Sequence, residues 1–198
     1  MSNRLKDPAV GTIAVVGNAP DLGDHAAKID SCATIVRFNN APGFGGAAGK
    51  RVTHLALVNR GGQPREWVEE GFARIPALRE AREVILPFPR LVEGPPDICW
   101  TRQMQERLVP FGVRTRTLRG DLHERARLTL RAHGAKGRID PSTGFLVVFD
   151  LLDRAAPSRP VEIFGFGFAG WDGHPWDAER RWFEAAHARG DLVLHPVS

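Results

Sequence analysis

A histidine and a glutamate five positions apart, His174 and Glu179, stand at the start of the last predicted helix. Pro175 suits the first helical position, which puts His174 at the helix cap with its imidazole outside the helix. The positive end of the helix dipole favours the neutral imidazole, which is the form that a general base needs. The pattern indicates a base that removes a proton from a substrate, although a histidine that only caps the helix has the same sequence.

Two glycine-bearing segments in the same third of the chain are suited to binding an anion. Pro141-Ser142-Thr143-Gly144 places two hydroxyls at the predicted start of an apolar helix, where unpaired amides and the helix dipole attract negative charge. Gly165-Phe166-Gly167 ends a predicted strand with two residues that let a ligand pack against bare backbone. The alternative for Ser142 or Thr143 is a helix cap whose hydroxyl is consumed locally.

Two asparagine turns follow the first two predicted strands. Gly17-Asn18 comes after residues 12–16, and Asn39-Asn40 comes after residues 33–38. In open α/β sheets ligands bind outside the carboxyl ends of the strands, and an amide side chain there can bond a phosphate or a base. Ordinary turn chemistry explains the same residues, so the two interpretations stay open at this point.

Other kinds of catalytic centre lack their characteristic residues. No His, Cys, Asp or Glu cluster has metal-ligand spacing, so we expect no metal. The chain has neither a Gly-x-Ser-x-Gly elbow nor a phosphate loop of the Gly-Lys-Ser kind. It has two cysteines, Cys32 and Cys99, and without an export signal we expect both to be reduced.

Apolar runs of strand length alternate with longer segments of helical period, which predicts helices on both faces of a mostly parallel sheet. The predicted strands are 12–16, 33–38, 52–58, 83–87, 113–118, 161–166 and 192–195. The predicted helices are 21–27, 64–82, 100–109, 121–133, 141–152 and 175–189. Prolines and glycines over 87–96 predict a loop that faces the substrate.

The length and composition are those of one soluble domain spanning residues 1–198, with 42% hydrophobic and 25% charged residues. The sequence shows no apolar stretch of bilayer length and no apolar signal-peptide core, so we expect a cytoplasmic protein without a transmembrane segment. The net charge is +4, but arginines alternate with acidic residues, which argues against a nucleic-acid partner. Arg114, Arg116 and Arg119 form a purely basic run, predicted on one face of a strand.

Three motifs, in their order along the chain, resemble those of the sialyltransferases of glycosyltransferase family 29. The segments Val15-Val16-Gly17-Asn18 and Ile35-Val36-Arg37-Phe38-Asn39-Asn40 resemble the family's long motif. Pro141-Ser142-Thr143-Gly144-Phe145 through Gly165-Phe166-Gly167 resembles its short motif, and His174 followed by Glu179 is similar to its His-x-x-x-x-Glu motif. The sequences of these motifs also resemble those of small bacterial members of the family that are labelled urease operon accessory proteins. This label implies no chemistry.

The resemblance implies a Rossmann-like three-layer fold, a CMP-activated nine-carbon acid as donor, inversion at the anomeric carbon, and no metal or other cofactor. It assigns the base to His174 and a supporting role in the same motif to Glu179. The expected donor is CMP-sialic acid or a related CMP-sugar, and the expected acceptor is a glycan or another hydroxyl. The residues that the resemblance places around the donor are Gly17, Asn18, Asn39, Ser142, Thr143, Gly144, Gly165, Phe166 and Gly167.

The chain also departs from the family pattern. Ile13 stands where animal members have the first cysteine of a disulfide. The chain has no tyrosine, so any family tyrosine contact must be absent or replaced, by Trp100 or a phenylalanine.

Two functions remain open. The first is a metal-independent, inverting transferase of a sialic-acid-like or Kdo-like sugar, and the second is a non-catalytic CMP-binding or nucleotide-sugar-binding accessory or regulatory module. A methyltransferase would need an acidic residue at the end of the second strand, where Arg37 and Asn39 stand instead.

Overall fold

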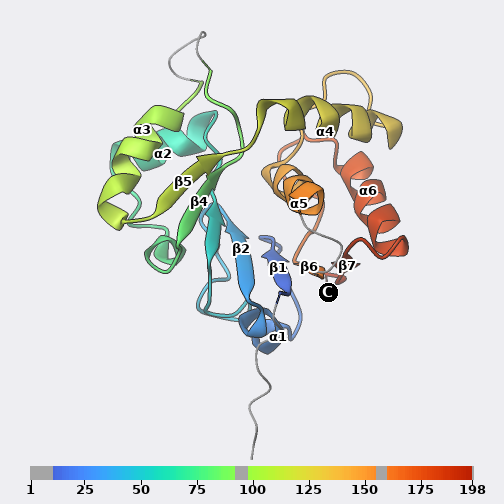
Figure 1. Ribbon diagram of the computed structural model, residues 1–198, viewed down its shortest axis with the longest axis horizontal. Helices are drawn as coiled ribbons and strands as arrows, with labels where there is room; N and C mark the ends of the chain where they lie inside the picture. Colours follow the sequence, from blue (N-terminus) through green and yellow to red (C-terminus); the bar gives the residue numbers. More distant parts are fainter. Residues whose placement is uncertain (1–10, 92–97, 155–159, 198) are drawn as a thin grey trace, which may run out of the picture.

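The computed structural model describes residues 11–91, 98–154 and 160–197, and seven strands in these ranges form one sheet (Figure 1). Their order is β5-β4-β3-β2-β1-β6-β7, and each neighbouring pair is parallel. The strands are β1 Ile13–Val16, β2 Thr34–Phe38, β3 His54–Ala56, β4 Glu83–Leu86, β5 Arg114–Thr117, β6 Val161–Phe164 and β7 Val193–Leu194.

Helices cover both faces of this sheet. The α-helices are α1 Ala26–Ser31, α2 Gly62–Glu70, α3 Thr101–Leu108, α4 Gly120–Ala132, α5 Thr143–Arg154 and α6 Trp176–Ala188, with short 3-10 helices at Pro76–Arg79 and Val109–Phe111. Side chains alternate along β1, so that Ile13 and Val15 pack with α4, α5 and α6, whereas Ala14 and Val16 pack with α1. The prediction of a Rossmann-like three-layer α/β sandwich is confirmed.

The long helix predicted over 64–82 is wrong. The α-helix ends at Glu70, Gly71 follows with φ +91°, and a 3-10 helix begins at Pro76. A glycine in this conformation leaves the helix, and a proline cannot continue one. The apolar stripe was nevertheless identified correctly, because Trp67, Phe72 and Leu78 share one buried cluster with β3 and β4.

Two other helix starts were also wrong. The helix predicted over 21–27 lies at Ala26–Ser31, since Gly23 turns the chain with φ +68°. The last helix begins at Trp176, so Pro175 is the N-cap residue rather than the first helical residue, and His174 lies one position further out.

The basic run, predicted on one face of a strand, has two of its three arginines on a strand. Arg114 and Arg116 lie on β5 and both approach Glu83 on β4, at 3.7 and 2.6 Å. Arg119 lies beyond the strand, at the N-cap of α4, and pairs with Asp153 at 3.2 Å. Each of the three arginines therefore has a carboxylate partner within the fold.

The order of the sheet places a crevice beside β1. From β1 the chain proceeds through β2 to β5 on one side, and then returns with β6 to the other side of β1. The loops after β1 and β6 therefore leave the sheet in opposite directions, and ligands of open α/β sheets bind at such a point. Among the described residues no helix has the length and apolar character needed to cross a membrane.

Candidate functional site

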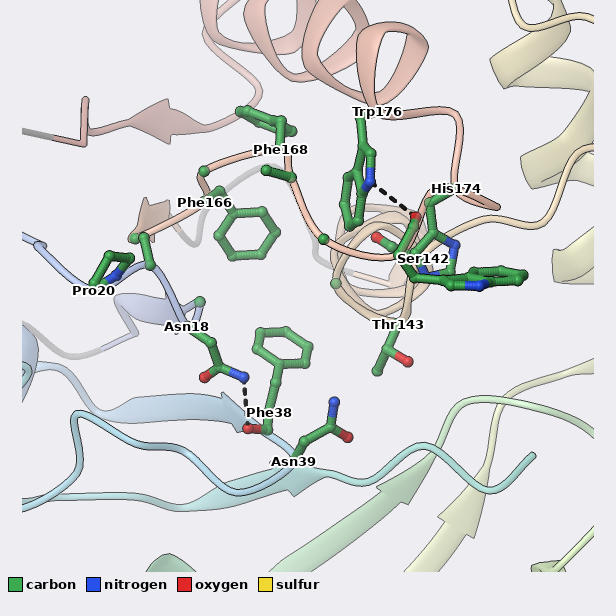
Figure 2. A pocket seen from close by; sticks show the side chains of 18 residues that line it. Asn18, Pro20, Phe38, Asn39, Ser142, Thr143, Phe166, Phe168, His174 and Trp176 are labelled. Carbon is green, nitrogen blue, oxygen red and sulfur yellow. Dashed lines mark hydrogen bonds between the residues drawn. The ribbon is translucent and has the colours of Figure 1, made fainter. Parts of the chain in front are cut away.

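A cleft of about 400 Å³ lies at this crevice, a volume within the usual range for small-molecule sites. It is formed where the ends of β1, β2 and β6 meet the starts of α5 and α6 (Figure 2). Its lining includes ten of the eleven predicted site residues: Gly17, Asn18, Asn39, Ser142, Thr143, Gly144, Gly165, Phe166, Gly167 and His174. Segments more than 150 residues apart in the chain are brought together here, as the resemblance implied.

Gly17 and Gly165 make the cleft possible by packing against each other. The Gly17 amide donates to the Phe164 carbonyl at 2.8 Å, and the Ala19 amide donates to the Gly165 carbonyl at 3.1 Å. A Cβ on Gly17 would lie 2.3 Å from the Gly165 oxygen. Gly165 has φ +66°, and a Cβ there would lie 2.8 Å from Leu22. The lack of a side chain at these two positions lets the turns after β1 and β6 pack against each other. From the sequence, the glycines were expected to make room for a ligand.

The start of α5 offers donors to the cleft. Within the described structure the amides of Thr143 and Gly144 have no acceptor, because they belong to the first turn of the helix. The Thr143 hydroxyl is half-buried and lies on the cleft side (Figure 2). Two amides and a hydroxyl at the positive end of a 12-residue helix form an anion-binding arrangement.

Ser142 faces inward, in contrast to Thr143. Its hydroxyl donates to Glu179 Oε2 at 2.7 Å and accepts from the Phe145 amide at 3.0 Å. Its own amide donates to Glu179 Oε1 at 2.7 Å. The Ser142 hydroxyl proton is therefore committed to Glu179, and the cap alternative raised from the sequence describes this residue.

Glu179 lies beneath the cleft and does not line it. The side chain is buried on α6, and burial raises the pKa of its carboxyl to about 7 against the opposing effect of the two Ser142 hydrogen bonds. No cation pairs with it in the described structure. Through these hydrogen bonds Glu179 braces the turn before α5 from behind the cleft.

The ring of His174 is held in one tautomer. Its Nδ1 lies 2.7 Å from the carbonyl oxygen of Asp140, which can only accept a hydrogen bond. Nδ1 therefore carries the proton of the neutral ring, and Nε2 keeps the lone pair that a base requires. The indoles of Trp171 and Trp176 contact the imidazole edge-on from two sides, each at 4.9 Å between ring centroids. The carbonyl of Asp140 and the braced Ser142 are separated only by Pro141, so Glu179 also fixes the acceptor of the His174 hydrogen bond.

The two asparagine turns differ in their roles. Asn18 Nδ2 donates to the Phe38 carbonyl at 3.2 Å, which ties the end of β1 to the end of β2. Asn39 has φ +50°, and its Oδ1 accepts from the Val58 amide at 3.0 Å, so its Nδ2 points into the cleft (Figure 2). Asn40 does not line the cleft, because its Oδ1 accepts from the Trp67 indole at 3.1 Å.

The cleft is almost free of charge. Among the described residues that line it, His174 is the one ionisable side chain. No group of three or more His, Cys, Asp or Glu in the described ranges has an arrangement that could hold a metal ion.

Aromatic rings fill the rest of the lining, and the sequence analysis missed most of them: Phe38, Phe168, Trp171 and Trp176. The alternation of β2 could have placed Phe38 at the cleft. Trp100, offered as a replacement for a tyrosine, packs instead with α2 and α3. Residues 92–96 of the loop predicted over 87–96 lie outside the described ranges, and the described half, residues 87–91, does not line the cleft. Both cysteines are free, as expected.

Comparison with known proteins gives one sequence relative and several structural neighbours. No family model matches the chain. The urease operon 23 kDa accessory protein of Rhizobium meliloti (strain 1021) is 29% identical over 203 aligned residues, which cover 94% of each protein. A mammalian sialyltransferase superimposes with a TM-score of 0.57 at 19% identity, over 93% of this chain and 68% of the other.

The sialyltransferase CstII from Campylobacter jejuni, solved with the substrate analogue CMP-3FNeuAc, superimposes with a TM-score of 0.58 at 9% identity. This match covers 93% of the present chain and 81% of CstII. Likeness at these identities establishes a shared fold. The chain therefore has the fold of the sialyltransferases, and its activity must be argued from its own residues.

Proposed function

We propose that the chain transfers a 2-keto acid sugar, of the sialic acid or Kdo type, from its CMP ester to a hydroxyl acceptor, without a metal. The proposal rests above all on one observation. A histidine whose Nδ1 bonds the Asp140 carbonyl, and whose Nε2 has no hydrogen-bond partner in the described structure, lines the same cleft as the unpaired amides at the start of α5. The fold shared with two sialyltransferases supports the same class of reaction.

The charge of the cleft favours a donor with one phosphate. The phosphodiester of a CMP-sugar carries one negative charge, in addition to the carboxylate of a 2-keto acid sugar, whereas the pyrophosphate of a UDP-sugar or GDP-sugar alone carries two. A helix N-terminus is equivalent to about half a positive charge, which suits a single phosphate. The described lining has no Lys or Arg for a second phosphate and no carboxylate to hold a divalent cation.

In the proposed reaction the acceptor hydroxyl oxygen forms a bond to the anomeric carbon as the bond from that carbon to the CMP phosphate oxygen breaks. Nε2 of His174 takes the hydroxyl proton. The electron pair of the broken bond leaves with CMP, whose growing charge the amides of Thr143 and Gly144 stabilise. Attack from the face opposite to the phosphate inverts the anomeric configuration.

A second candidate function is a nucleotide-binding accessory module without transfer activity. The name of the Rhizobium meliloti relative, which refers to a urease operon accessory protein, favours this alternative. Both candidates need CMP to bind in the cleft, and they differ in whether CMP is released from a CMP-sugar.

Thermal unfolding in the presence of nucleotides tests the binding step. A ligand that binds only the folded state at about 100 times its Kd adds about 2.7 kcal/mol, or roughly 5–10 °C for a chain of this size. We expect CMP to raise the melting temperature by this amount, and UDP and GDP to raise it less. A larger shift with UDP, or none with CMP, would contradict the proposal. CMP binding without CMP release from CMP-sialic acid or CMP-Kdo would identify the accessory module.

A further inference from the structure

The imidazole of His174 becomes positively charged when it takes a proton, and no carboxylate in the described structure is bonded to it. The single hydrogen bond of the ring joins Nδ1 to the Asp140 carbonyl at 2.7 Å. Glu179, the nearest buried carboxyl in the sequence, is committed to Ser142 behind the cleft. A base that gains charge in an almost neutral cleft depends on stabilisation from other groups.

Two indoles lie beside this imidazole. The ring centroids of Trp171 and Trp176 are each 4.9 Å from the centroid of His174, and the ring planes meet at 85° and 80°. At such angles the edge of one ring points at the face of the other. The face of an indole has a negative potential, which attracts a cation within about 6 Å of the ring centroid. Both indoles are therefore close enough to attract a charged imidazole.

Hydrogen bonds within the turn before α6 hold the two indoles in place. The Trp171 carbonyl accepts from the His174 amide and from Nε1 of Trp176, both at 3.1 Å (Figure 2). A Cβ on Gly173 would lie 2.2, 2.4 and 2.4 Å from three consecutive atoms of the six-membered ring of Trp171. A point nearly equidistant from three such atoms lies over the ring and not beside its rim. The face of Trp171 is thus turned toward the backbone that carries His174.

Charged side chains near His174 do not duplicate this contact. Those that line the space on the other side of the imidazole come from the loop after α4, from the turn that carries His174 and from α6: Lys136, Arg138, Asp172, Asp177 and Arg181. The carboxylate of Asp140 adds a sixth charge and pairs with Arg138 at 2.8 Å. Three cations and three carboxylates carry no net charge, and in the described structure none of their side chains bonds the imidazole.

We propose that the faces of Trp171 and Trp176 stabilise the positive charge of His174 as Nε2 takes the acceptor proton; this inference rests on the proposed function. In a Ser-His-Asp triad a carboxylate bonded to Nδ1 stabilises the charged imidazole. Here Nδ1 bonds a carbonyl, and the two indoles supply the stabilisation instead. Neutral rings suit an anionic donor, which a carboxylate in the same place would repel.

The titration of His174, followed through its Cε1–H signal by NMR, tests the inference without requiring turnover. The signal is assigned by its absence from His174→Gln. Trifluorinated tryptophan, placed at position 171 alone, keeps the ring but weakens its negative face. Trp171 is 62% exposed, so the replacement does not threaten folding. We expect the titration midpoint to move to lower pH, by an amount equivalent to about twofold to fivefold weaker proton binding.

Fluorination at two other positions calibrates this shift. At Trp176 the effect should be at least as large, because this half-buried ring is less screened by water. At Trp100, which lies outside the cleft lining and packs with α2 and α3, the midpoint should not move. An unchanged midpoint after fluorination of Trp171 and Trp176, or a shift to higher pH, would overturn the inference.

The rate of CMP release from CMP-sialic acid or CMP-Kdo provides the second readout. Trp171→Leu should lower the rate about twofold to fivefold and Trp171→Phe by less, with CMP affinity within about threefold of the wild type. The acid limb of the pH–rate profile should move to lower pH together with the NMR midpoint, which a merely structural role would not produce. A shifted midpoint in a protein that releases no CMP would count against the proposed function alone. CMP release with an unshifted midpoint would count against the inference alone.

Discussion

Two buried carboxyl groups, Glu179 on α6 and Asp150 on α5, lie in opposite electrostatic surroundings. Each side chain is about 1% exposed. Asp150 accepts from Arg116 at 3.2 Å and from Arg154 at 2.8 Å, and Arg116 also bonds Glu83 at 2.6 Å. Glu179 has only the amide and hydroxyl of Ser142. One carboxyl is compensated by cations and the other by neutral donors.

The difference separates Asp150, which belongs to a network of ion pairs, from Glu179, which holds the turn before α5. The arginines around Asp150 connect β4, β5 and α5, far from the cleft lining. Glu179 stabilises the turn before α5, and the residues that follow this turn present free amides to the cleft. If a cation took the place of Ser142 as the partner of Glu179, it would add a charge beside a cleft that otherwise lacks one. Buried groups that break the usual pairing rules are characteristic of functional sites.

The largest effect that distinguishes the two carboxyls is the pH dependence of stability. Burial raises the pKa of Glu179 to about 7 in the folded state, above the ordinary value of 4.5 that the carboxyl has in an unfolded chain. The folded state then holds the proton more tightly, so the stabilisation is complete below pH 4.5 and is lost as the pH rises through 7. The free energy of unfolding of the wild type minus that of Glu179→Gln should fall by about 3 kcal/mol between pH 5 and pH 8, measured by urea unfolding.

Subtraction is needed because burial lowers the pKa of His54 and His123, which changes stability in the opposite direction. Asp150→Asn is the matched control, since it loses its ion pairs at pH 5 and pH 8 alike and its difference from the wild type should stay level. A level difference for Glu179→Gln as well would show that Glu179 is not the group that responds to pH.

A smaller effect separates the two neighbouring hydroxyls, Ser142 and Thr143. Ser142→Ala leaves Glu179 Oε2 and the Phe145 amide without partners, and should lower the free energy of unfolding by about 2 kcal/mol.

Thr143→Val keeps the shape of the side chain and removes a hydroxyl on the cleft side. It should weaken CMP binding about fivefold with a stability change within about 0.5 kcal/mol. Calorimetric CMP titration and urea unfolding of both variants give the two readouts, and the reverse pattern would exchange the roles assigned here.

Much of the architecture followed from the sequence, because the strands of a covered parallel sheet are short apolar runs that are easy to recognise. The helix over 64–82 failed since a buried stripe persists through Gly71 and Pro76 even where the backbone is no longer helical. Helix starts failed by one to five residues, because caps depend on local turns such as that at Gly23.

For the site, the motifs identified which residues meet but not what each does there. The Ser142 hydroxyl and the Gly17 backbone were expected to serve the ligand, and both are committed to packing within the protein. Such commitments depend on contacts with Glu179 and Gly165, distant in the chain, whose geometry no local pattern contains.

The most direct test of the account is the rate of CMP release from CMP-sialic acid and CMP-Kdo by the wild type and by His174→Ala, with CMP affinity measured on both proteins. If Nε2 of His174 is the base, the variant should lose about 10²–10⁴-fold in rate and keep CMP affinity within about threefold. His25→Ala, which alters a histidine outside the cleft, should retain the wild-type rate. An unchanged rate in His174→Ala would contradict the role of this histidine and, with it, the proposed reaction.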